Sequence, residues 1–133
     1  MKTKVAAIYG KQDVRIREFE LPEISDNELL VSVISDSVCL STWKAAKLGS
    51  EHKRVPGDLE NHPVITGHEC AGVIVEVGKN LTDKYKKGQR FVLQPAMGLP
   101  SGYSAGYSYE YFGGNATYMI IPEVAINLGC VLP

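Results

Sequence analysis

Short apolar runs separated by turn residues mark the first part of the chain. A mainly apolar run over residues 4–9 ends at Gly10, and residues 14–19 alternate apolar and charged side chains. Two such runs joined by a polar turn around Lys11 are typical of a β-hairpin. The alternation in the second run predicts one dry face and one solvated face.

The same pattern continues along the chain and predicts more strands than helices. Further strands are predicted over residues 29–34, 71–77, 90–94 and 116–121. One short helix is predicted over residues 43–48, with Ser41 or Thr42 as its cap and Gly49 as its stop. Many short strands with turn signals between them indicate a mainly β domain of barrel type.

Length and charge narrow the class of protein. A chain of 133 residues corresponds to one domain, and its net charge of −1 gives no reason to expect nucleic acid or an anionic membrane as a partner. No apolar stretch approaches the length of a membrane span. The three cysteines, Cys39, Cys70 and Cys130, form an odd and small set without a signal peptide, which predicts a reducing, cytoplasmic location.

Chemically active side chains gather at two strand ends. Gly67 to Cys70 places an imidazole, a carboxylate and a thiol directly before the predicted strand 71–77. Cys39 follows the predicted strand 29–34, with Ser41 two residues later. Ligand-type side chains at the mouth of a rigid strand are suited to holding a metal ion or a catalytic group.

Three sequence blocks, in matching order and spacing, carry a family resemblance. They are VCLST at 38–42, GHECAGVIVEVG at 67–78 and KGQRFV at 87–92. Together they resemble the N-terminal catalytic domain of zinc-dependent medium-chain alcohol and polyol dehydrogenases, including sorbitol dehydrogenases and sorbose-1-phosphate reductases. The resemblance covers residues 1–133 as a single domain. It implies a mainly β, GroES-like, partly open β-barrel with short helices.

The resemblance also implies roles for four residues. Cys39 and His68 are the expected ligands of one catalytic zinc ion. Glu69 is either a direct zinc ligand or an outer partner of the site, and both roles are open. Such a zinc ion polarises an alcohol or carbonyl oxygen for hydride transfer with NAD(P), and the Ser41 hydroxyl begins the proton relay.

Residues 95–115 depart from many members of this family. They are rich in Gly, Ser and Tyr and contain no cysteine, so no structural zinc is expected. The tyrosines there line a substrate entrance or a subunit contact, or the segment is a partly solvated loop, and we expect the loop. Cys70 and Cys130 are predicted to be packing residues, and His52 and His62 ordinary loop residues.

The chain contains no Gly-x-Gly-x-x-Gly fingerprint for a dinucleotide. In the family a Rossmann domain supplies NAD(P) binding, so we expect residues 1–133 alone to be inactive. The implied substrate is a small alcohol, polyol or ketose, with or without a phosphate, and the implied full-length form is a homo-oligomer. Two other interpretations stay open: a stand-alone zinc-binding module without redox activity, and a barrel that functions through oligomerisation alone.

Overall fold

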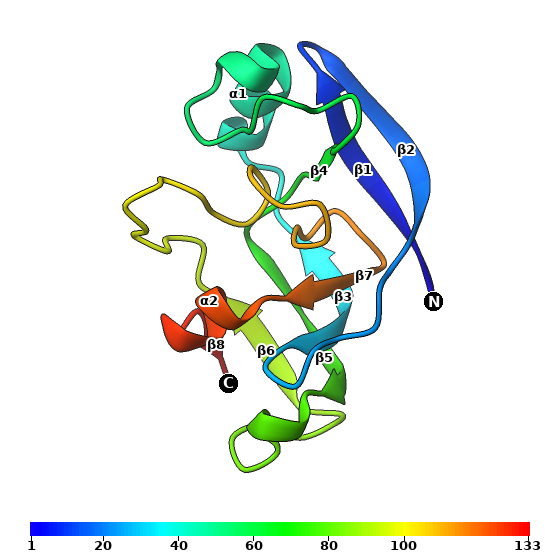
Figure 1. The fold of residues 1–133 in the computed structure, drawn as a ribbon, viewed down its shortest axis with the longest axis vertical. Helices are drawn as coiled ribbons and strands as arrows, with labels where there is room; N and C mark the ends of the chain where they lie inside the picture. Colours follow the sequence, from blue (N-terminus) through cyan, green and yellow to red (C-terminus); the bar gives the residue numbers. More distant parts are fainter.

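Two antiparallel sheets make up the fold in a computed structural model that describes residues 1–133 (Figure 1). The smaller sheet has the strand order β2-β1-β4, and the larger has the order β7-β3-β5-β6-β8. The strands are β1 (Lys2–Gly10), β2 (Asp13–Glu20), β3 (Leu29–Asp36), β4 (Val64–Ile65), β5 (Cys70–Val77), β6 (Arg90–Leu93), β7 (Tyr118–Ile121) and β8 (Val131–Leu132). The helices are α1 (Leu40–Leu48) and α2 (Glu123–Asn127), with 3₁₀ turns η1 (Gly49–Glu51) and η2 (Lys79–Leu81). The prediction of a mainly β domain is confirmed.

The N-terminal hairpin is confirmed, but the predicted dry face of its second strand is wrong. β1 and β2 pair antiparallel from Lys2 opposite Glu20 to Ile8 opposite Val14. Val14 and Ile16 remain 46% and 63% exposed. β2 is the edge strand of the smaller sheet, and α1 approaches it only near Val14, so most of the strand stays exposed to solvent.

The main core lies against the larger sheet. Its largest fully buried side chains include Phe91, Phe112, Leu29, Ile74 and Met119. They come from strands β3, β5, β6 and β7 and from the loop that precedes β7. Burying each of them contributes roughly 1.5–3 kcal/mol, which makes this cluster the principal source of stability.

Strand β1 joins the two sheets. Val5 forms an isolated bridge with Ala116, and the Thr3 hydroxyl donates to the Tyr118 carbonyl at 2.7 Å. The Thr117 amide also donates to the Lys4 carbonyl at 3.0 Å. The smaller sheet is therefore attached to the larger one along the start of β7 without closing into a single continuous barrel.

The pairing of β3 with β5 is unusually close at Gly72. A Cβ atom at this position would collide with the backbone carbonyl of Ser32 and lie 3.1 Å from the Phe91 ring. The absence of a side chain thus allows the two central strands and the Phe91 ring to pack together.

Helix α1 ends where the sequence predicts and begins earlier. Gly49 terminates it with φ of 54°, a conformation that suits glycine. The helix starts at Leu40, so Cys39 is the N-cap and no side chain caps the first turn. The prediction that Ser41 or Thr42 caps the helix is wrong, because both residues already lie inside the first turn.

The expectation of a partly solvated loop over residues 95–115 is wrong for its second half. Residues 104–108 and 112–114 are buried, with Tyr107 3% and Phe112 2% exposed. The Tyr109 carbonyl accepts from Ile65, and the Tyr111 carbonyl accepts from Ile120. This Tyr-rich segment is therefore an irregular layer of the core.

Neither helix has the length and apolar character needed to cross a membrane.

The Gly72 contact makes a direct prediction about stability. Replacement Gly72→Ala should lower the free energy of unfolding by about 3 kcal/mol, because the added methyl group must push β3 away from β5. Chemical denaturation measures this change. Gly57→Ala is the matched control: a Cβ there meets nothing within 4 Å, and the expected change is within about 0.5 kcal/mol. Equal stabilities for the two variants would contradict this account of the β3–β5 contact.

Candidate metal centre

The antiparallel pairing of β3 and β5 brings together the three predicted ligand residues. Asp36, at the end of β3, lies opposite Cys70, at the start of β5. Cys39 follows the first of these strands, and His68 and Glu69 precede the second. One ligand atom from each of Cys39, His68 and Glu69 lies within 4.8 Å of the other two.

Cys39 occupies the N-terminus of α1. Its backbone is extended, with φ of −110° and ψ of 135°, and its Sγ lies 3.1 Å from Ser41 Oγ. The free amides and the dipole at a helix N-terminus favour a negatively charged group such as a thiolate. Ser41, the predicted relay residue, therefore contacts the predicted ligand directly.

His68 is held rigidly, whereas Glu69 is more open to solvent. The His68 side chain is 10% exposed and that of Glu69 is 43% exposed. The His68 ring packs against Tyr107 with 5.2 Å between ring centroids, and its Nε2 lies 3.5 Å from Glu69 Oε1. The buried ring thus presents one nitrogen toward the two other donor atoms.

This donor set fits a zinc ion. A thiolate, an imidazole nitrogen and a carboxylate oxygen are the usual zinc donors. Two N or O ligands at ordinary zinc distances in a tetrahedron are about 3.4 Å apart. The 3.5 Å between His68 Nε2 and Glu69 Oε1 is close to that edge length. If all three side chains bound zinc, one of its four usual positions would remain for a substrate oxygen, as in catalytic zinc sites.

The Asp36 carboxylate holds the backbone on both sides of the site by hydrogen bonds. The sequence analysis did not identify this residue. Its Oδ1 accepts from the amides of Ser37 at 2.7 Å and Glu69 at 3.1 Å, which links the two ligand-bearing segments. Oδ2 is buried without a hydrogen-bond partner. Burial raises the pKa of Asp36, and the two amide hydrogen bonds oppose that rise. In the sequence, only the position of Asp36 just after an apolar run pointed to a role at the site.

The remaining cysteines fit the prediction of packing residues. Cys70 and Cys130 are both buried and make no disulfide. Burial raises the pKa of Cys70 to about 12, and the nearby charge of Asp36 adds to the effect. A thiol of this kind stays protonated and unreactive at neutral pH.

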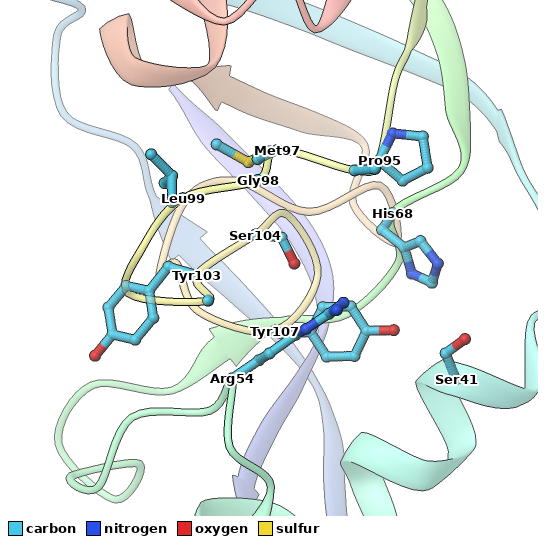
Figure 2. Close-up of a pocket in the computed structure, with 12 residues that line it drawn as sticks. Ser41, Arg54, His68, Pro95, Met97, Gly98, Leu99, Tyr103, Ser104 and Tyr107 are labelled. Atoms are coloured by element: carbon cyan, nitrogen blue, oxygen red, sulfur yellow. The ribbon is translucent and has the colours of Figure 1, made fainter.

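A pocket of about 410 Å³ opens beside His68, one of the candidate ligands (Figure 2). Its lining includes Ser41, Arg54, His68, Tyr103 and Tyr107. Figure 2 shows that these side chains come from the helix α1, from the segment before β5 and from two loops. The sequence analysis named Ser41 and His68 but not Arg54, because a basic residue in a polar loop carries no signal of its own.

A comparison with protein families identifies the domain. Residues 25–128 match the alcohol dehydrogenase GroES-like domain. The chain belongs to this family. The family resemblance drawn from the three sequence blocks and the GroES-like fold are thereby confirmed.

Individual relatives share this region at high identity. The chain is 70% identical over 132 residues to mannitol-1-phosphate 5-dehydrogenase of Aliivibrio fischeri, and 43% identical over 131 residues to L-sorbose 1-phosphate reductase of Klebsiella pneumoniae. These two matches cover 99% and 98% of this chain, but only 31% and 32% of the lengths of the two relatives. The chain thus spans about a third of the length of the curated relatives it matches.

A solved structure supports the same assignment. The crystal structure of 2R,3R-butanediol dehydrogenase from Bacillus subtilis superposes with a TM-score of 0.77 at 27% identity. The match covers 92% of this chain and 39% of that chain. The domain is therefore of the type found in alcohol and polyol dehydrogenases, which are oxidoreductases.

The Tyr-rich segment contacts residues 67–69, which carry His68 and Glu69 and are called the ligand loop below. This contact generates a second prediction. Gly106 has φ of 80°, and a Cβ there would lie 2.5 Å from the Gly67 carbonyl oxygen, next to His68. Gly102 has φ of 77°, but a Cβ there meets nothing within 4 Å. Gly102→Ala should cost about 1 kcal/mol of stability from backbone strain alone.

Gly106→Ala carries the same strain and an added collision, so it should cost about 2 kcal/mol more than Gly102→Ala. Urea denaturation of the two variants measures the difference. If the two variants lose the same stability, the contact of Gly106 with Gly67 does not hold the ligand loop.

Proposed function

We propose that this domain holds the catalytic zinc ion of an NAD(P)-dependent polyol or ketose dehydrogenase. The observation that carries the proposal is the convergence of Cys39, His68 and Glu69 within 4.8 Å of one another beside a pocket. The proposed site contains one zinc ion, and no second, structural zinc is proposed for residues 95–115.

Each residue of the site has a distinct proposed task. Cys39 and His68 are zinc ligands, and Glu69 is a third ligand or a carboxylate that stabilises the other two. Zinc bound there supplies Lewis acidity toward an alcohol or carbonyl oxygen. Ser41 is the first group of the proposed proton relay: during oxidation its Oγ accepts the alcohol proton as its own hydroxyl proton passes on toward the solvent in the pocket, and both transfers reverse during reduction. The 3.1 Å contact of Ser41 Oγ with Cys39 Sγ supports this role.

The pocket walls orient the substrate and limit water. Tyr107 is buried against His68, and its ring forms part of the wall next to the reacting oxygen. NAD(P) binding is assigned to parts of the enzyme outside this domain, because these residues contain no dinucleotide fingerprint. The similarity to mannitol-1-phosphate 5-dehydrogenase, L-sorbose 1-phosphate reductase and butanediol dehydrogenase supports polyols and ketoses, with or without a phosphate, as the substrate class.

Metal content tests the proposal. The purified 133-residue chain should contain about one zinc per molecule by elemental analysis, and His68→Ala should contain none, because one of three protein donors is lost. Free zinc at 100 times its Kd should raise the free energy of unfolding of the wild type by about 2.7 kcal/mol. Ser41→Ala should keep its zinc, since the hydroxyl is assigned to proton transfer and not to metal binding.

Two further variants sharpen this experiment. His62→Ala removes an exposed imidazole that pairs with Glu110, and it should keep full zinc content. Glu69→Gln should lose zinc outright if the carboxylate is a ligand, and should weaken zinc binding by about 10–100-fold if it is an outer partner. A folded wild-type chain with the same zinc content as His68→Ala would overturn the proposed site.

A further inference from the structure

A group of basic side chains lies next to the candidate metal centre, where the sequence analysis predicted only an ordinary loop. A second pocket, of about 500 Å³, is lined by Lys44 from α1 and by His52, Lys53 and Arg54 from the loop after η1. The chain as a whole has a net charge of −1, so this concentration of positive charge is local.

The charges of this group are not neutralised by carboxylates. None of Lys44, Lys53 and Arg54 takes part in an ion pair. Glu51, the acidic residue next to them in sequence, pairs instead with Lys11 at 3.0 Å. An unpaired group of cations at a pocket is a favourable place for an anion.

The cations are close enough to act on one another. Burial lowers the pKa of His52, and the charges of Arg54, Lys44 and Lys53 lower it further. His52 Nδ1 accepts from the Arg54 amide at 3.1 Å. A neutral His52 therefore carries its hydrogen on Nε2 and offers a donor in addition to the three cations.

Tyr107 connects the basic group to the candidate metal centre. The Arg54 guanidinium lies over the Tyr107 ring, 5.5 Å from its centroid, and the His68 ring lies 5.2 Å from the same centroid. Arg54, Ser41 and Tyr107 line both pockets. A small molecule that contacts His68 in the first pocket can therefore also contact Arg54 of the basic group, and Figure 2 shows Arg54 beside Tyr107 in this pocket.

We propose that Arg54, Lys53 and Lys44 form a subsite for the phosphate group of a phosphorylated polyol or ketose. This inference rests on the proposed function for the position of the reacting oxygen. Arg54 supplies a planar fork of donors suited to phosphate oxygens, and the lysines add point charges. The subsite makes phosphorylated substrates the specific class and anchors them by the phosphate group.

The phosphate of a dinucleotide such as NADP is the competing source of the same chemistry. The position of the cluster favours the substrate, because Arg54 and Ser41 share walls with His68 in the pocket where the reacting oxygen would lie. The experiment therefore compares both sources.

Binding of three probes to the 133-residue chain tests the subsite. Mannitol 1-phosphate, mannitol and NADP are titrated by calorimetry at fixed ionic strength, with metal content measured on each sample. Mannitol 1-phosphate should bind, and mannitol should bind at least tenfold more weakly. The double variant K53Q/R54Q should lose about tenfold or more in affinity for mannitol 1-phosphate and keep the zinc content of the wild type.

The control is Lys84→Gln, which removes one exposed positive charge in the turn before β6, away from both pockets. It should bind mannitol 1-phosphate as the wild type does. Arg54→Lys should bind less tightly than the wild type but more tightly than K53Q/R54Q, because it keeps the charge and loses the fork.

The outcomes separate this inference from the proposed function. Equal affinities for mannitol 1-phosphate and mannitol, or equal losses in K53Q/R54Q and Lys84→Gln, would overturn the subsite. Tight NADP binding that K53Q/R54Q abolishes, without binding of mannitol 1-phosphate, would overturn it as a substrate site. Phosphate discrimination in a chain that holds no zinc would support the subsite and count against the metal centre.

Discussion

The antiparallel pairing of β3 with β5 is the constraint on which the candidate metal centre depends. Antiparallel strands place the end of one beside the start of the next, so residues far apart in sequence become neighbours without a local motif. Asp36 and Cys70 mark this meeting point. Gly72 lets the strands approach closely, and the Asp36 carboxylate ties the amide of Glu69 to the end of β3. The sheet thus determines the separation of the donor atoms.

A second support comes from the Tyr-rich segment, which packs its backbone against the ligand loop. The Gly114 amide donates to the Gly67 carbonyl at 2.8 Å, and Gly106 lies against the same residue. Side chains are excluded at these contacts because the two backbones touch. The segment also supplies Tyr107, whose ring packs against both the His68 ring and the Arg54 guanidinium. One irregular loop therefore positions a proposed ligand and a proposed anion-binding residue together.

The sequence predicted the parts of this structure that depend on local pattern. Strand positions follow from apolar runs, and the site residues from three blocks in register, which is why Cys39, His68 and Glu69 were named correctly as neighbours. Three features were not predicted because they depend on tertiary packing. They are the exposed face of β2, the earlier start of α1 and the buried half of the Tyr-rich segment. Alternation alone does not reveal whether a strand lies at an edge. Arg54 was missed for the same reason, since its proposed role comes from its proximity in space to Tyr107 and His68.

The order of events during folding follows from the way the donor atoms converge. Cys39 and His68 are separated in sequence by α1, η1, a loop and β4, and only the completed sheets bring them together. Closing that loop in an unfolded chain costs entropy that no local contact offsets. In the unfolded chain only His68 and Glu69 lie close together, and the third candidate donor, Cys39, is distant, unlike in a small zinc finger, where all the ligands lie close along the chain. The complete set of proposed metal donors therefore exists only once β3 and β5 have paired, so a metal ion bound there would stabilise the folded sheet and not help to form it.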